Sequence, residues 1–219
     1  MLYYAGQFLK ESERKDLRKS LLMASEWEDG KNTASGSTKD IKKNIQLVRG
    51  DTYKKYSEYI IKAVLSNNRI RNFAFPANVF QILFTRTGSG MFYGPHVDLC
   101  FIDDKRRDLS FTIFLNDKND YKGGELVLYI PPETRTIKLD AGQIIIYPTK
   151  YLHEVKKVTE GERMVCVGWI QSQVINDDDR EVLGLIRKAQ GDIDNSKITL
   201  QTKLNLNSVF NRMLKRLSS

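Results

Sequence analysis

Apolar residues recur with two different periods along the chain. Residues 9–25 and 52–66 carry apolar side chains at helical spacing, so both segments predict amphipathic helices. Residues 28–39 are rich in Asp, Gly, Ser, Thr and Asn and predict a loop, and a short strand is expected at 45–48. The buried side of the second helix is expected to hold Tyr56, Tyr59, Ile60, Ala63 and Val64.

From residue 78 the pattern changes to short runs with period-two alternation, which is typical of β-strands. Eight candidate strands follow one another, at 79–87, 97–101, 109–115, 125–130, 134–139, 143–147, 154–158 and 163–171. Turn residues predict the connections at 88–90, 116–124, 131–132, 141–142 and 160–161. The helical pattern returns at 177–188 and 206–217.

This order of elements predicts a mainly β fold with flanking helices. The strands are expected to form a double-stranded β-helix (jelly roll) supported by N-terminal helices and a C-terminal helical segment. We expect residues 1–77 to form the support region, 78–175 the jelly-roll core and 176–219 a helical extension. The apolar stripe on that extension is expected either to pack within the chain or to form a homodimer through these helices.

Composition and charge narrow the classes of protein. The chain is 41% hydrophobic and 28% charged, and no apolar run reaches the roughly 18 residues of a membrane span. Its first residues are too polar for a signal peptide, so we expect a cytoplasmic protein with no membrane partner. The net charge of +8 is spread over separate clusters such as residues 39–43. Diffuse charge favours solvated faces over a nucleic-acid platform. In a cytosolic protein Cys100 and Cys166 are expected to be buried thiols without a disulfide.

The chain has two histidines, and both occupy positions that suit a metal site. His96 opens the triplet His96-Val97-Asp98, and His153 follows at the edge of a later predicted strand. Two imidazoles and one carboxylate that leave coordination positions open are typical of non-haem iron(II) oxygenases. Period-two alternation would turn His96 and Asp98 to the same face of a strand. The sequence therefore predicts an Fe²⁺ site on His96, Asp98 and His153.

Arg163 follows His153 by ten residues, at the start of the next predicted strand. Its guanidinium offers a fork of donors that matches a carboxylate. A 2-oxo acid that binds iron leaves its far carboxylate inside an apolar barrel, where a cation has to meet it. Arg163 is therefore the candidate 2-oxoglutarate ligand, with O₂ as the second co-substrate.

Further blocks of sequence extend these motifs over most of the chain. They include Trp27-Glu28-Asp29-Gly30-Lys31-Asn32-Thr33-Ala34, Lys43-Asn44-Ile45-Gln46-Leu47 and residues 90–98, 107–115, 121–126, 138–142, 147–153, 158–163 and 169–172. In these blocks the chain resembles the prokaryotic PKHD-type (prolyl/lysyl-hydroxylase-like) Fe(II)/2-oxoglutarate-dependent dioxygenases.

The resemblance implies a reaction as well as a fold. It implies hydroxylation of a prolyl or lysyl-like residue in a peptide or protein, with conversion of 2-oxoglutarate and O₂ to succinate and CO₂. Iron would be held by His96, Asp98 and His153, 2-oxoglutarate by Arg163, and L-ascorbate would serve as a reductant.

Five other residues are candidates for contacts around the metal. Relatives tend to carry Tyr where Thr87 stands, with a hydroxyl that could help hold the co-substrate. Thr87 is short, so Tyr93 or a water molecule is expected to take the place of that hydroxyl. Trp169 shares the period-two phase of the co-substrate arginine and is expected either near the substrate or in the core. Asn44 and Gln46 are expected on one face of their strand, either at the substrate or in ordinary sheet-edge hydrogen bonds.

Two other functions stay open. The net charge of +8 motivates an oxygenase acting on alkylated nucleic acid or on a small molecule. Nucleic-acid dealkylases usually carry a further arginine beyond the co-substrate arginine, and residues 164–173 offer none. The other alternative is a non-catalytic metal-binding jelly-roll module. Structural zinc sites are generally closed by four protein ligands, so three ligands argue against it.

Overall fold

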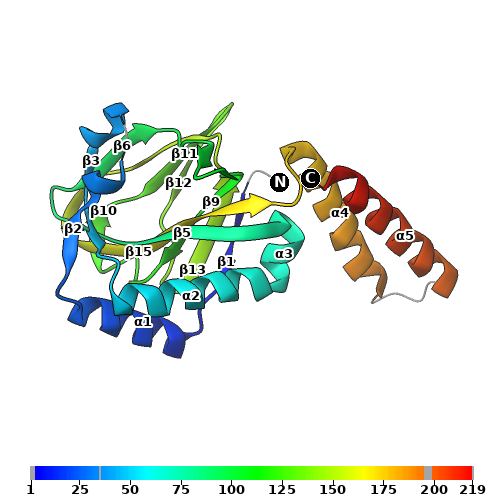
Figure 1. The fold of residues 1–219 in the computed structure, drawn as a ribbon, viewed down its shortest axis with the longest axis horizontal. Helices are drawn as coiled ribbons and strands as arrows, with labels where there is room; N and C mark the ends of the chain where they lie inside the picture. Colours follow the sequence, from blue (N-terminus) through cyan, green and yellow to red (C-terminus); the bar gives the residue numbers. More distant parts are fainter. Residues whose placement is uncertain (1–2, 35, 195–198, 219) are drawn as a thin grey trace.

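Two antiparallel β-sheets form the body of the protein in the computed structural model, which describes residues 3–34, 36–194 and 199–218 (Figure 1). The larger sheet has the order β1 (Tyr4–Gln7), β13 (Gln143–Pro148), β9 (Leu109–Phe114), β15 (Val158–Ser172), β5 (Pro76–Gly88), β4 (Ile45–Leu47) and β2 (Trp27–Asp29), and β10 (Tyr121–Gly123) also pairs with β15. The smaller sheet has the order β12 (Glu133–Ile137), β11 (Leu126–Ile130), β14 (Leu152–Val155), β6 (Phe92–His96) and β3 (Lys42–Lys43). The predicted jelly roll with flanking helices is confirmed.

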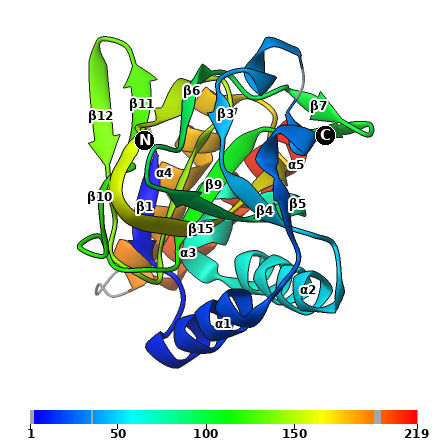
Figure 2. The same ribbon diagram turned by 90° about the vertical axis from the view of Figure 1, so that its left-hand side faces the viewer.

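Three helices cover the outer face of the larger sheet: α1 (Glu11–Met23), α2 (Asp51–Ser66) and α3 (Asn68–Ala74) (Figure 2). Alternation along β15 explains why this face is apolar, since Met164, Cys166 and Ile170 pack in the same buried cluster as the helices. On α2 the buried residues are Tyr56, Ser57, Ile60 and Val64, whereas Tyr59 and Ala63 are only half-buried.

The last two helices, α4 (Asp177–Asp194) and α5 (Leu200–Leu217), stand beside the barrel (Figure 1). They pack around a small core of Phe75, Val174, Leu183 and Phe210, in which Met213, Leu214 and Leu217 are partly buried. Part of the predicted apolar stripe is therefore used within the chain, and the homodimer stays a prediction. No helix in the described ranges is long and apolar enough to cross a membrane.

Several predicted boundaries in the β region are wrong. The strand expected at 154–158 is instead β14 (Leu152–Val155), which ends before β15 begins at Val158. β6 ends at His96, and residues 97–100 are irregular, so the expected strand at 97–101 does not exist; only Phe101–Ile102 (β7) pairs, with Lys105–Arg106 (β8). The turn expected at 160–161 lies inside β15, because β10 pairs with Glu160 and Gly161 and extends that strand toward its N-terminus.

Local features account for the remaining differences. The sequence pattern did not predict α3, which begins where the Asn67 side chain accepts hydrogen bonds from the backbone N–H groups of Arg69 and Ile70. The predicted loop at 28–39 contains β2 and two 3₁₀ turns, η1 (Gly30–Thr33) and η2 (Gly36–Lys39). Cys166 is buried as expected, but Cys100 is exposed in the irregular segment, and neither forms a disulfide.

The packing of α1 against the sheet can be tested with adjacent leucines. Leu21 is fully buried in the helix–sheet cluster, whereas Leu22 is 45% exposed. Leu21→Ala should lower the free energy of unfolding by about 2–5 kcal/mol, because it leaves a cavity in the core. Leu22→Ala should change it by about 0.5 kcal/mol or less. Denaturant unfolding measures both, and equal effects would contradict this placement of α1.

Candidate metal centre and its cavity

His153 and His96 are direct neighbours across two antiparallel strands. They pair in the register of β14 with β6, and their ring centroids lie 4.3 Å apart. Nδ1 of His96 lies 2.8 Å from the carbonyl oxygen of Gly94, and Nδ1 of His153 lies 3.0 Å from that of Tyr151. A carbonyl oxygen only accepts, so each Nδ1 donates its proton there and each Nε2 keeps a free lone pair for a metal.

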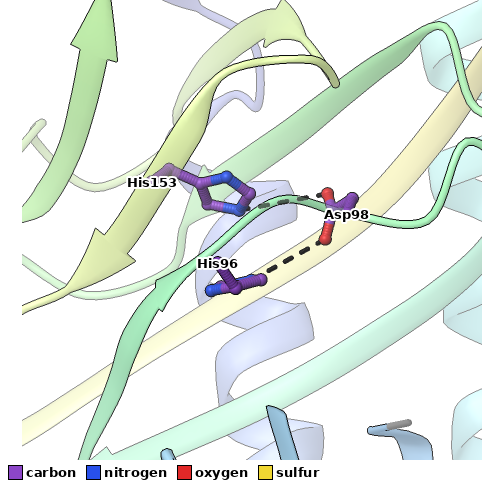
Figure 3. A group of neighbouring side chains, drawn as sticks. All are labelled: His96, Asp98 and His153. Atoms are coloured by element: carbon purple, nitrogen blue, oxygen red, sulfur yellow. Dashed lines mark ion pairs between the residues drawn. The ribbon is translucent and has the colours of Figure 1, made fainter. Parts of the chain in front are cut away.

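Asp98 reaches the histidines from the irregular segment after β6. Its Oδ1 lies 3.7 Å from Nε2 of His96 and its Oδ2 3.9 Å from Nε2 of His153 (Figure 3). Ser110 Oγ and Trp169 Nε1 donate hydrogen bonds of 2.8 and 2.9 Å to Oδ2. The ligand atoms of the three residues all lie within 4.8 Å of one another. Hydrogen bonds from two neighbouring strands, rather than strand alternation, therefore position this carboxylate.

The environment sets the protonation states that a metal requires. Burial and the neighbouring His153 lower the pKa of His96 to about 4, so this imidazole is neutral at pH 7. Burial alone would raise the pKa of Asp98, but His153, the Trp169 indole, His96 and the Ser110 hydroxyl together hold that pKa below its usual value. Neutral imidazole and ionised carboxylate are the forms that bind metal ions.

One cavity of about 440 Å³ is lined by every residue that the sequence analysis predicted for the site. Its volume lies in the range of small-molecule sites. The nominated residues that line it are Asn44, Gln46, Thr87, Tyr93, His96, Asp98, His153, Arg163 and Trp169.

Arg163 lies in the barrel interior, where it is 3% exposed and pairs with Thr87 across β15 and β5. Its guanidinium lies 5.4 Å from the centroid of the Phe114 ring. Among the described residues, its Nε and the hydroxyl of Tyr121 have no hydrogen-bond partner. Burial lowers the pKa of Arg163, while Tyr121 and Tyr147 oppose that effect. An arginine remains charged in proteins, so this buried cation is suited to an anionic ligand.

A diglycine turn makes room for this arginine. Gly124 has a φ of +68°, and a Cβ atom there would lie 3.2 Å from Cδ of Arg163 and 3.0 Å from Cε2 of Tyr121. The absence of a side chain at Gly124 therefore leaves space for Arg163, because a larger side chain there would crowd the arginine.

A polar network occupies the side of the cavity formed by β3, β4 and η1. Lys42 Nζ donates to Thr33 Oγ1, which donates to Oε1 of Gln46, both at 2.8 Å. Asn44 lies between β3 and β4 rather than on the strand of Gln46, and its Oδ1 and the Nε2 of Gln46 lack partners among the described residues. Tyr93 stacks on His96, with ring centroids 3.7 Å apart.

Sequence reasoning missed several residues of the cavity. Lys42 belongs to a charged cluster that predicted a solvated face, but it is only 4% exposed, because β3 pairs with β6 and η1 covers it. Arg107 and Ser110 also line the cavity. A signal for both existed, since they lie in the block 107–115 that carried the family resemblance.

Comparisons with known proteins agree with this geometry. The sequence profile of the family described as "2OG-Fe(II) oxygenase superfamily" matches residues 81–171. A PKHD-type hydroxylase of Prochlorococcus marinus strain MIT 9515 is 46% identical over 185 residues, which cover 84% of each chain. A PKHD-type hydroxylase of strain MIT 9313 is 42% identical over 177 residues and 80% of each chain.

The chain belongs to the PKHD-type hydroxylases. As a member of this family of 2OG-Fe(II) oxygenases, it is a 2-oxoglutarate-dependent dioxygenase that uses Fe²⁺, 2-oxoglutarate and O₂. Solved structures confirm the fold of this PKHD-type hydroxylase. A prolyl-4-hydroxylase of Pseudomonas putida has a TM-score of 0.56 at 19% identity, covering 78% of this chain and 92% of that one. A Trichoplax adhaerens prolyl hydroxylase, in complex with a peptide fragment of the hypoxia inducible factor oxygen degradation domain, has a TM-score of 0.57 at 20% identity, covering 83% and 86%.

The hydrogen bond from Trp169 to Asp98 should support metal binding in this PKHD-type hydroxylase. Trp169→Phe removes the indole donor and keeps an aromatic ring, so Fe²⁺ affinity should fall by about 10–100-fold. The chain's other tryptophan, Trp27, donates to the carbonyl of Ala24 and lies outside the cavity. Trp27→Phe is therefore the matched control. Anaerobic Fe²⁺ titration measures both, and unchanged affinity in Trp169→Phe would refute the supporting role.

Proposed function

We propose that the protein hydroxylates a prolyl or lysyl-like residue of a peptide or protein, with Fe²⁺ on His96, Asp98 and His153 and 2-oxoglutarate on Arg163. The observation that carries this proposal is that one cavity brings together three metal-ligating groups and a buried arginine that has no ion-pair partner among the described residues. The bound iron with its 2-oxo acid supplies the oxidising power. The names of the curated relatives and of the two solved prolyl hydroxylases support the substrate class.

The protein's own residues have separate tasks in this proposal. Ser110 and Trp169 orient the Asp98 carboxylate, and the carbonyls of residues 94 and 151 fix the tautomers of the two histidines. Arg163 neutralises the far carboxylate of 2-oxoglutarate inside the barrel, with Thr87 and Tyr93 proposed as further contacts. The apolar walls exclude water from the reacting groups.

The mouth of the cavity suits a polypeptide substrate. Val97 and Leu99 line the cavity and are 48% and 56% exposed, and Phe101 beside them is also exposed. Exposed apolar side chains grouped at a cavity rim are typical of surfaces that bind a partner. We propose that this rim holds the chain on either side of the target residue, and that Trp169, Asn44 and Gln46 lie near the bound substrate.

Three other expectations accompany the proposal. L-ascorbate is proposed as a reductant that restores Fe²⁺, the protein is proposed to act in the cytoplasm, and α4 and α5 are proposed to offer a homodimer surface. These expectations do not change the assignment of the site.

Loss of one histidine tests the metal assignment. The enzyme is loaded with Fe²⁺ and 2-oxoglutarate without oxygen, and succinate is measured after oxygen is added. His153→Ala should reduce succinate to the background of iron-free protein, because two remaining ligands do not form the facial triad. Mass spectrometry of proline-centred and lysine-centred peptides then tests for one added oxygen atom in the wild-type reaction. Equal succinate release by wild type and His153→Ala would reject the assignment.

Exchange of one cation for another tests the co-substrate site. Arg163→Lys keeps the charge but loses the fork of donors, so the KM for 2-oxoglutarate should rise by about tenfold or more. Arg86 on the neighbouring strand pairs with Glu162 outside the cavity, and Arg86→Lys should leave this KM unchanged. Steady-state succinate assays at varied 2-oxoglutarate compare the two variants. A rise in neither variant would remove Arg163 from the co-substrate site.

A further inference from the structure

Four cationic side chains are buried within the described residues: Lys42, Arg107, Arg163 and Arg180. Arg180 forms an ion pair with Asp177 and lies outside the cavity. The other three all line the cavity of the metal centre, and none of them has a carboxylate within ion-pair distance in the described chain. A buried charge without a counter-charge is costly, so a cavity that keeps three such cations is suited to anionic ligands.

Lys42 lies beside the ring stack of the metal centre. Its Nζ is 5.2 Å from the centroid of Tyr93, the ring that stacks on His96. Among the described residues its ammonium group donates one hydrogen bond, to the hydroxyl of Thr33, which is neutral. Burial lowers the pKa of Lys42 to about 8, so the amine remains mostly charged at pH 7.

Arg107 lies on Trp169, the residue that holds the metal-binding carboxylate. Its guanidinium is 4.1 Å from the centroid of the Trp169 ring and donates to the neutral side chain of Gln81. Its Nε has no partner among the residues described. Burial lowers the pKa of Arg107, and Asp98, Tyr93 and Asp103 oppose that effect. Asp98 and Asp29 oppose the same effect of burial on the pKa of Lys42. Both cations therefore lie close enough to Asp98 to interact with it.

The co-substrate does not balance these charges. Fe²⁺, ionised Asp98, the 2-oxoglutarate dianion and Arg163 are together neutral when both histidines are neutral. Asp29 and Asp103 also act on Lys42 and Arg107, but neither lies within ion-pair distance of them. Lys42 and Arg107 therefore remain in excess inside the cavity, and an acidic group on the substrate would supply the missing negative charge.

We propose that Lys42 and Arg107 bind a carboxylate of the polypeptide substrate, so that the enzyme selects a target residue with an acidic group close to it. This inference rests on the proposed function and names the substrate class more narrowly. An aspartate or glutamate side chain and a C-terminal carboxylate offer the same chemistry. Such a site should bind a carboxylate more tightly than an amide of the same shape, because the amide leaves the buried cations without a counter-charge.

Matched peptides test the preference without turnover. Short fluorescent peptides centred on proline or lysine carry Asp at one flanking position or Asn at the same position, and end in a free carboxylate or an amide. Their binding to enzyme loaded with Fe²⁺ and 2-oxoglutarate is measured by anisotropy in the absence of oxygen. At least one Asp–Asn or carboxylate–amide pair should differ by about tenfold or more in Kd. Equal Kd values in every pair would overturn the proposal.

Variants of Lys42 and Arg107 test whether these two cations cause the preference for the acidic peptide. Lys42→Met and Arg107→Gln should each reduce the ratio of Kd values within a peptide pair to about twofold or less, while the Kd for 2-oxoglutarate stays unchanged. Lys43→Met removes the same charge from the exposed neighbour of Lys42 and should keep the full preference. A higher Kd for 2-oxoglutarate with an intact peptide preference would mean that these cations serve the co-substrate, and the proposal would fail. An acidic preference without peptide hydroxylation would reject the proposed function instead.

Thermal unfolding separates a binding role from a structural one. Lys42→Met replaces an uncompensated buried charge with an apolar side chain, so its Tm should equal or exceed that of the wild type. Arg180→Met breaks a buried ion pair and should lower the Tm. If Lys42→Met lowers the Tm as much as Arg180→Met, Lys42 is structural and the proposal is overturned.

Discussion

The pairing of β14 with β6 is the interaction on which the site depends. It places His153 opposite His96 on one face of the smaller sheet. Because side chains alternate along a strand, a slip of one residue would turn His153 out of the barrel. The next strand fixes this register, since His153 also lies opposite Leu128 of β11, which is fully buried between the sheets. Ordinary apolar packing therefore sets the distance between the two imidazoles.

The two faces of β15 have different roles, because side chains alternate along the strand: one face packs against the helices and the other faces the cavity. Cys166 and Ile170 point toward the helices and join the larger buried cluster, whereas Arg163 and Trp169 point into the cavity. Between Met164 and Ile170 the helix-facing side chains of β15 carry no charge, so they can be packed for stability alone. The cavity side can then keep cations and hydrogen-bond donors that would weaken a core. Such a division explains how one strand carries both the buried Arg163 and part of the main core.

Features that depend on the local sequence pattern were predicted from the sequence. Features that depend on contacts between distant segments were missed. Period-two runs predicted the jelly roll, and the two histidines led to the prediction of a metal site whose three residues the structure brings together. Strand alternation does not place Asp98 beside the histidines, since it lies beyond the strand and is held by Ser110 and Trp169. Lys42 was assigned to a solvated face, because nothing in its local sequence shows that η1 and β6 bury it. Its burial follows from pairing between segments fifty residues apart.

The two hydrogen bonds donated to Asp98 also affect how many coordination positions a bound metal would have free. Ser110 and Trp169 both donate to Oδ2, whereas Oδ1 is the oxygen closer to His96 and accepts no hydrogen bond from the described residues. A carboxylate held in this way offers one oxygen to a metal rather than two. If a metal ion were bound by one Asp98 oxygen and the two imidazoles, coordination positions would stay open for a 2-oxo acid and O₂. A carboxylate that bound through both oxygens would leave fewer positions. The donors from β9 and β15 would therefore help to keep these positions open, because they leave one oxygen of Asp98 for a metal.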